Sequence, residues 1–249
     1  MEQAPRKGQL TRDKFGASMP VDAPYYQSPP FYYRDARSLT VTFETDPDAA
    51  AEILPEGLEL PVPAHAALMV VYYPTSTFGP YNEAILGIPC RWQGEDQFYV
   101  AHIAVDTVPP LVGGREIWGY PKKIADIELS EEDEFVRGTL ERPTGVRLVT
   151  VAMRPERPLP PAGDGGPAAV SLRVIPSAEA NQPPVVAELI QVPSTDRRVH
   201  EAWSGPATLQ FDAESSLDPW HALPIRNVLL GVYSRFDFTL PHGRVLRRY

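Results

Sequence analysis

The sequence of 249 residues lacks several features on which common catalytic sites depend. Its single cysteine, Cys90, allows neither an internal disulfide nor a cluster of thiolate metal ligands. The five histidines show no spacing such as His-Glu-x-x-His, so we predict no metal site. There is no Gly-x-Ser-x-Gly motif of the serine hydrolases. The spacing from Gly114 to Gly119 resembles a phosphate-binding loop, but Tyr120 stands where that loop requires lysine.

Basic patches and long apolar runs are also missing. The net charge is −9 and no stripe of lysine and arginine stands out, which argues against a nucleic-acid partner. No apolar run approaches the roughly 18 residues that cross a bilayer, so we predict no membrane partner. Residues 1–20 are polar and mixed in charge, and we therefore expect no signal peptide and a cytoplasmic location.

Proline and glycine are abundant, with 29 and 17 residues. Because proline interrupts helices and central strands, this composition predicts many short elements joined by turns. Residues 1–30 are interpreted as an N-terminal arm that ends at Ser28-Pro29-Pro30, and residues 31–249 as a single domain. A chain of this length fits one mainly β domain.

The pattern of apolar residues predicts a mainly β protein of the α+β type, with a few short helices. Asp46-Pro47 is a typical helix start and predicts a short helix over 48–54. Residues 109–120 are expected to form a short helix or turn that leads into a tight loop, and 154–167 a loop. Strands are predicted over 38–45, 66–73, 98–105, 124–129, 135–140, 146–153, 172–175, 186–192, 208–211 and 228–240.

The segment with the strongest chemical character is 114–123, Gly-Arg-Glu-Ile-Trp-Gly-Tyr-Pro-Lys-Lys. Paired lysines after a proline commonly form a solvated loop. Here aromatic residues precede the pair and a strand-like run follows it, and no other segment is as strong a candidate for a nucleophile. These features weaken the interpretation as a solvated loop and leave a catalytic role open.

This segment resembles the signature of the acetoacetate decarboxylase family, in which Gly-Arg-Glu is followed by two variable residues and Tyr-Pro-Lys-Lys. Residues 78–83, Phe-Gly-Pro-Tyr-Asn-Glu, are similar to a glutamate-bearing loop of that family. Residues 199–206, Val-His-Glu-Ala-Trp-Ser-Gly-Pro, are similar to its late Val-His-Glu-Ala-Trp-Thr-Gly-Pro segment. The resemblance implies a cone-shaped antiparallel β-barrel and a homo-oligomer.

The family resemblance implies that Lys122 is the catalytic nucleophile and forms a covalent imine with a small oxo acid, without a cofactor. An amine attacks a ketone only in its neutral form, and a nearby cation or burial can favour that form. The resemblance implies that Lys123 supplies the nearby cation. It also places the carboxylate of Glu83 in the cavity. However, consecutive residues of a strand point to opposite faces, so Lys123 could instead attach the loop to a carboxylate.

Other residues of the matched segments are predicted to surround the substrate or to support the site. Tyr120, Trp118 and Tyr81 are interpreted as substrate-binding residues of the cavity wall. Arg115 and Glu116 are expected to brace the loop as an ion pair.

The sequence departs from the family pattern at two positions. The family places an arginine near the start of the first core strand, where an ungapped count gives Ala36. Arg34 and Arg37 lie close by, and a gap of one residue would bring in Arg37 as a substrate-binding residue, although without a gap it faces the other way. A second cavity glutamate, 15 residues before the first, corresponds to Leu68.

These departures lead to three hypotheses for function. The favoured one is a lyase that forms an imine with pyruvate or a similar 2-oxo acid and catalyses aldol addition and dehydration, with Glu83 as proton carrier. The alternative is an acetoacetate decarboxylase that releases CO₂ and acetone. A ligand-binding protein that keeps the fold without turnover is the third, and the intact lysine pair argues against it.

Overall fold

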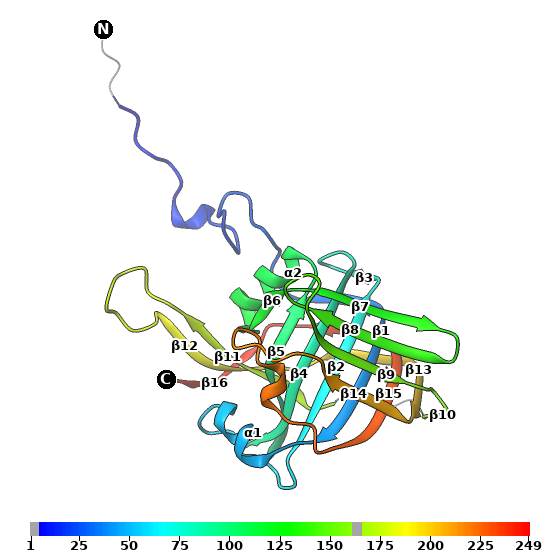
Figure 1. Cartoon of the computed structure of the whole chain (residues 1–249). Coiled ribbons are helices and arrows are strands. Elements are labelled where there is room, and N and C mark those ends of the chain that lie inside the picture. Colours follow the sequence, from blue (N-terminus) through cyan, green and yellow to red (C-terminus); the bar gives the residue numbers. More distant parts are fainter. Residues whose placement is uncertain (1–4, 161–165) are drawn as a thin grey trace.

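A computed structural model describes residues 5–160 and 166–249 and shows a mainly β protein (Figure 1). Two sheets account for all its strands. The larger sheet has 12 strands, ten of which follow one another in a hydrogen-bonded path. In order along that path they are β10 (Arg157–Pro158), β13 (Thr195–Gly205), β15 (Asn227–Leu240), β1 (Phe31–Glu44), β2 (His65–Tyr73), β4 (Tyr81–Trp92), β5 (Glu95–Val105), β11 (Ala168–Ile175), β12 (Val186–Val192) and β16 (Arg244–Arg248).

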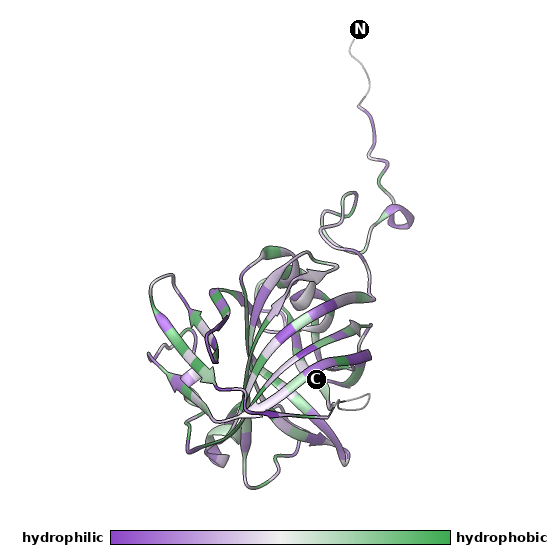
Figure 2. Ribbon diagram, turned by 90° about the vertical axis from the view of Figure 1, so that its right-hand side faces the viewer, coloured by the Kyte–Doolittle hydropathy of each residue, from purple (hydrophilic) through white to green (hydrophobic). Residues whose placement is uncertain are grey.

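Two short strands extend this sheet beside the path. β3 (Thr75–Ser76) pairs with β1, and β6 (Lys122–Ile124) pairs in parallel with β5. Most other pairings are antiparallel, as predicted, and the sheet curls strongly (Figure 2). The path is open among the described residues, since it ends at β10 and β16 instead of closing into a ring.

The smaller sheet packs on one face of the larger one. Its strands, in order, are β14 (Ala207–Phe211), β9 (Arg147–Met153), β8 (Phe135–Glu141) and β7 (Asp126–Glu132). An aliphatic core fills the space between the two sheets, with Leu39, Leu68 and Leu86 from the large sheet meeting Leu140 and Val151 from the small one. The small sheet therefore covers most of this face.

The opposite face of the large sheet carries an aromatic cluster. Side chains alternate between the two faces along each strand. On β2, Leu68 and Val70 enter the aliphatic core, whereas Met69 and Tyr73 join the aromatic cluster. The candidate site lies on this second face, so the alternation of β2 decides which residues can reach a substrate.

Two α-helices are present among the described residues, and both lie within one residue of where the sequence predicts a helix start or turn. α1 (Pro47–Ile53) has Asp46 as its N-cap, which accepts hydrogen bonds from the backbone amides of Asp48 and Ala49. α2 (Val108–Gly113) continues into the π-helical turn η2 (Gly114–Trp118). Short 3-10 turns are η1 (Arg12–Lys14) and η3 (Trp220–Ala222), and no described helix is long and apolar enough to cross a membrane.

All ten strand predictions are confirmed, most of them with shifted boundaries, but six of the described strands were not predicted: β3, β4, β6, β10, β13 and β16. The most consequential omission is β4, because Glu83 lies on this strand and not on a loop. Gly87 and Pro89 gave the segment the composition of a turn. Gly87 is required there because a Cβ atom would lie 2.4 Å from the ring of Phe98 on β5.

Two segments interpreted as irregular lie at the edge of the fold. The described part of the N-terminal segment, residues 5–30, is mostly exposed and leads away from the sheets (Figure 1). Within the predicted loop 154–167, Arg157–Pro158 forms β10 against β13, and residues 161–165 lie outside the described residues.

Candidate active site

Lys122 reaches the aromatic face because a tight turn precedes it. The chain leaves η2 at Gly119, which has a φ of 76°. Glycine is needed here for two reasons, since other residues rarely adopt this conformation and a Cβ atom would lie 2.4 Å from the Cα of Arg173. After this turn, Lys122 enters β6 opposite Ile103 of β5. The turn at Gly119 thus places Lys122 on the face of the large sheet that carries the aromatic cluster.

The Lys122 amine is buried and paired with a carboxylate. Its Nζ lies 2.6 Å from Oε2 of Glu83, and the two side chains are only 5% and 6% exposed. Tyr73 donates a hydrogen bond from its hydroxyl to Oε1 of Glu83 at 3.1 Å. Both oxygens of Glu83 therefore have partners, which offsets the cost of burying the pair. The two residues that the sequence placed in one cavity are in direct contact.

Four buried tyrosines surround this pair: Tyr33, Tyr73, Tyr81 and Tyr120. Burial, with the nearby Glu83 carboxylate, raises the pKa of Tyr73, Tyr81 and Tyr120 above the usual value. These hydroxyls stay protonated at neutral pH and can donate hydrogen bonds. The Lys122 Nζ lies 5.7 Å and 5.9 Å from the ring centroids of Tyr81 and Tyr120, a distance at which an ammonium is attracted to the ring.

A cavity of about 430 Å³ opens beside the Lys122 amine. Its wall is mostly apolar and aromatic, and Glu83, Lys122 and Arg197 are the charged residues among the described residues that line it. Other lining residues include Tyr33, Thr40, Ala67, Met69, Tyr73, Tyr81, Ile85, Phe98, Tyr120, Ser194, Phe236 and Phe238. A cavity of this size, with few polar groups, is typical of a small-molecule site.

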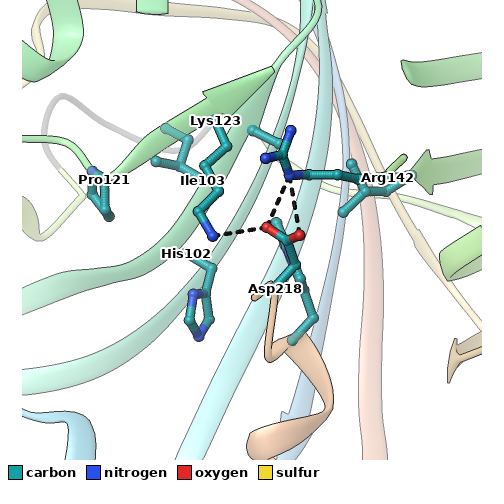
Figure 3. A pocket seen from close by; sticks show the side chains of 9 residues that line it. His102, Ile103, Pro121, Lys123, Arg142 and Asp218 are labelled. Carbon is teal, nitrogen blue, oxygen red and sulfur yellow. Dashed lines mark hydrogen bonds and ion pairs between the residues drawn. The ribbon is translucent and has the colours of Figure 1, made fainter. Parts of the chain in front are cut away.

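Lys123 points away from this cavity. Its Nζ donates a hydrogen bond to Oδ1 of Asp218 at 2.9 Å and another to the carbonyl oxygen of Leu217. Arg142 shares the same Asp218 carboxylate, with Nε 3.0 Å from Oδ1 (Figure 3). Of the two roles considered for Lys123, the structure shows the attachment to a carboxylate.

The small pocket beside Lys123 contains His102 from β5 (Figure 3). Burial is the main reason that the pKa of His102 falls to about 4, with a smaller contribution from Lys123. The imidazole is neutral at physiological pH and packs near the ring of Trp220, at 5.8 Å between centroids. Within the described residues, no group of three or more His, Cys, Asp or Glu side chains is placed to hold a metal ion.

Arg115, Glu116 and Trp118 support the loop from outside the cavity. The guanidinium of Arg115 donates a hydrogen bond to the carbonyl oxygen of Lys122 at 3.1 Å. Glu116 accepts one from the Tyr26 hydroxyl at 2.7 Å. The expected ion pair between Arg115 and Glu116 is wrong for the described residues, because each has a different partner.

Trp118, which the sequence placed in the substrate wall, lies behind that wall. Its indole nitrogen donates to the carbonyl oxygen of Pro241 at 3.0 Å, and its ring packs against Phe31 and Tyr120. Trp118 is 1% exposed and does not line the cavity. It therefore positions Tyr120, which does.

Arg37 faces away from the cavity and does not take the place of the family arginine. Its guanidinium lies near Asp35 and Glu131, at 3.5 Å and 3.7 Å. The side chain shares the face of Leu39, as the ungapped count predicts. Ala36 packs in the aromatic cluster, so β1 supplies no cation to this face at that position.

The interpretation of Leu68 as a cavity position is wrong. Leu68 lies in the aliphatic core, and its neighbours Ala67 and Met69 line the cavity instead. An ungapped count of 15 residues from Glu83 ended on the wrong face of β2, since a shift of one residue exchanges the two faces. Even so, Glu83 is the single carboxylate among the described residues that line the cavity.

Sequence reasoning missed Arg197 and the aromatic residues Tyr33, Tyr73, Phe236 and Phe238, all of which line the cavity. The apolar alternation of strand 228–240 could have indicated Phe236 and Phe238 as one face. Nothing in the sequence distinguished Arg197 from its neighbour, because β13 was not recognised as a strand.

Gly114 gives the Lys122 side chain its space. A Cβ atom added there would lie 2.7 Å from Cδ and Cε of Lys122 and 3.3 Å from Nζ. We expect Gly114→Ala to displace the amine and to slow imine formation by up to about 100-fold, because small displacements of reacting groups are costly. Gly113→Ala is the matched control, since its Cβ would meet Phe78 instead. Borohydride trapping rates measure both variants, and equal losses would contradict a specific role for Gly114.

Known proteins resemble this chain over most of its length. The family model described as acetoacetate decarboxylase matches residues 18–249. The chain is 32% identical over 241 residues to acetoacetate decarboxylase 2 of Mesorhizobium japonicum, covering 93% of this chain and 89% of that protein. It is 30% identical over 237 residues to the acetoacetate decarboxylase of Burkholderia cenocepacia, covering 93% and 94%.

Solved structures show the same fold. The acetoacetate decarboxylase of Legionella pneumophila superposes with a TM-score of 0.85 at 29% identity, covering 99% of both chains. The enduracididine biosynthesis enzyme MppR, solved in complex with pyruvate, superposes with a TM-score of 0.80 at 23% identity, covering 95% of this chain and 99% of MppR. The family match over nearly the whole chain and the shared fold lead to one conclusion: this chain belongs to the acetoacetate decarboxylase family.

Proposed function

We propose that this protein is a lyase that forms an imine between Lys122 and a small oxo acid. The observation that carries the proposal is the contact of 2.6 Å between the buried Lys122 amine and Glu83, at the wall of an apolar cavity. A binding protein without turnover has no need for a buried amine paired with a proton acceptor. The enzymes among its relatives support catalytic activity.

The contact between the two residues suggests how the imine forms. Glu83 accepts a proton from the Lys122 ammonium, and the neutral amine adds to the carbonyl carbon of the substrate. The carbonyl oxygen then leaves as water, which produces a positively charged iminium. This group withdraws electrons from a neighbouring bond, and its reactivity requires no metal or bound cofactor.

We favour condensation of pyruvate, or a similar 2-oxo acid, with an aldehyde. Glu83 removes a proton from the carbon beside the iminium, and the resulting enamine adds to the aldehyde carbon. Loss of the new hydroxyl as water and hydrolysis of the imine release an unsaturated 2-oxo acid and free Lys122. The cavity of about 430 Å³ supports this reading, because it has room for a second reactant beside the first.

Decarboxylation of acetoacetate is the second candidate, and the names of the relatives with 30–32% identity favour it. In this reaction the C–C bond to the carboxylate breaks and CO₂ leaves. The electron pair of the broken bond moves into the iminium. Protonation and hydrolysis then give acetone. The apolar wall is compatible with this step, since it provides little stabilisation for the carboxylate that is lost.

Two assays on the same preparation distinguish the reactions. Pyruvate with an aromatic aldehyde is expected to give the ultraviolet absorbance of a conjugated 2-oxo acid, whereas acetoacetate is expected to release CO₂ slowly or not at all. The Lys122→Ala variant is the control for both assays. Rapid CO₂ release without condensation would favour the decarboxylase instead. If neither product forms and borohydride traps no imine, the protein is a ligand-binding member of the fold.

We further propose that residues 31–249 form one domain with an N-terminal arm over 1–30. The mostly exposed surface of residues 5–30 supports this division. A homo-oligomer and a cytoplasmic location remain proposals from the family resemblance and the composition. Gel filtration with light scattering tests the first, and fractionation of cells tests the second.

A further inference from the structure

Arg197 is the one guanidinium among the described residues that line the cavity. Its Cζ lies 4.8 Å from the ring centroid of Phe236, and no described carboxylate is within ion-pair distance of it. Lys122 and Glu83 neutralise each other, so Arg197 carries the uncompensated charge of this wall. Burial lowers the pKa of Arg197, which indicates that the charged group has lost part of its hydration.

The backbone turns Arg197 toward the cavity through a bulge. The pairing of β13 with β15 shifts register between Thr195 and Arg198, and Asp196 within this shift has a φ of 52°. Bulges are found beside active sites, where they change the direction of a side chain. The next residue, Arg198, is exposed and does not line the cavity. Of these two adjacent arginines, Arg197 therefore lies on the face of the sheet that carries the cavity, and the bulge lies directly beside it.

Arg197 lies on a different part of the wall from Lys122. In the order of the large sheet, β15, β1, β2, β4 and β5 separate β13 from β6, and the curl of the sheet brings both strands to one cavity. A row of aromatic rings connects the two cations, with neighbouring centroids 4.7 to 6.1 Å apart. In order from Lys122 to Arg197, the row consists of Tyr81, Tyr73, Phe238 and Phe236.

The cavity is also larger than pyruvate or acetoacetate requires. A water molecule occupies about 30 Å³ in the liquid, so a cavity of about 430 Å³ has room for roughly a dozen or more groups of that size. Pyruvate and acetoacetate are short, since one bond or one methylene separates their carbonyl and carboxylate groups, whereas the row between Lys122 and Arg197 contains four aromatic rings. The space between the cations is lined by rings, which suit an apolar segment.

We propose that Arg197 binds an acidic group at the far end of the substrate, separated by an apolar segment from the carbonyl that reacts with Lys122. The substrate class is then a long oxo acid or, for condensation, an aldehyde acceptor that bears a remote carboxylate. This proposal depends on the proposed imine chemistry for its reactive end, but the anion site of Arg197 can be tested without that chemistry.

The first experiment uses methyl ketones that end in a carboxylate, with a chain that lengthens by one methylene at a time, and the methyl ester of each. Borohydride trapping gives the half-saturating concentration for every ketone. A charge-assisted hydrogen bond should lower this concentration for the long acids by about 10- to 100-fold relative to their esters. In Arg197→Gln the ratio is expected to fall to about one. Equal ratios in both proteins, or a preference confined to the shortest acid, would overturn the proposal.

The controls separate this site from general charge and from the imine. Arg198→Gln removes the same charge from the adjacent, exposed position and should keep the preference for long acids. Arg197→Lys keeps the charge but loses the planar guanidinium and its paired hydrogen-bond donors, so an intermediate preference is expected. If the wild-type protein traps no ketone, the proposed function fails. Calorimetry with saturated carboxylic acids then tests whether Arg197 binds an anion. Binding about tenfold tighter to wild type than to Arg197→Gln supports the site, and equal binding overturns it.

Discussion

Replacement of Lys122 by alanine is expected to abolish imine trapping and to reduce product formation by about a thousandfold or more, as the loss of a catalytic nucleophile does in other enzymes. In the wild-type protein, borohydride reduction with pyruvate should add mass at Lys122 alone. Tandem mass spectrometry of the peptide that contains both lysines locates the label. The reason is geometric, since the Lys122 amine lies at the cavity wall and that of Lys123 does not.

Lys123→Met is the matched control for this experiment. It removes a lysine from the adjacent position, but one whose amine pairs with Asp218 outside the cavity. Trapping at Lys122 should persist in this variant, together with some loss of thermal stability, because Asp218 is buried and keeps only Arg142 as an ion-pair partner among the described residues. A label on Lys123, or trapping that survives Lys122→Ala, would contradict the assignment. Circular dichroism confirms that each variant is folded.

The second large effect is expected from Glu83→Gln. The amide has nearly the same shape as the carboxylate and can still accept a hydrogen bond from Tyr73, but it cannot carry a proton. Removal of a general acid–base group typically lowers rates by about 10²- to 10⁴-fold. We expect this loss in product formation, with imine trapping still detectable at long incubation times. Steady-state rates and trapped fractions, measured on one preparation, separate the two steps.

Tyr73→Phe is the control for Glu83. It removes the hydroxyl that lies 3.1 Å from Oε1 of Glu83 but keeps the carboxylate and its contact with Lys122. A loss of about 100-fold or less is expected, since one hydrogen bond to a charged group contributes roughly 1.5–3 kcal/mol and the proton carrier itself is kept. If Glu83→Gln retained product formation within about threefold of the wild-type rate, Glu83 would be a partner that only positions the Lys122 amine.

Local patterns identified the candidate segment 114–123 and indicated that its two lysines could point in different directions. The alternation of side chains along a strand offered divergence of Lys122 and Lys123 as an alternative to the role that the family resemblance gave Lys123, and β6 shows this divergence. The N-cap Asp46 and the following proline predicted the start of α1 for the same local reason. Each of these features depends on a few consecutive residues, so a sequence contains enough information to predict them.

Features that depend on register were predicted less well. Counting 15 residues back from Glu83 selected Leu68, which faces the aliphatic core, while Met69 beside it faces the cavity. β4 was not predicted because Gly87 and Pro89 resemble turn residues, although Gly87 is needed for the packing of Phe98. In both cases the deciding contact comes from another strand, so it depends on strand pairing and register and not on the local run of residues.

The sequence by itself determined the family, the mainly β class and the identity of the paired lysines, because these rest on composition, alternation and short motifs. Only the tertiary structure decided that Glu83 meets Lys122 at 2.6 Å and that Arg197 shares their cavity. The physical reason is that these three residues lie on β4, β6 and β13, whose positions follow from strand pairing and from the curl of the large sheet. A bulge of one residue in β13 also shifts the strand register beside Arg197, and such an irregularity has no signal in the order of the amino acids.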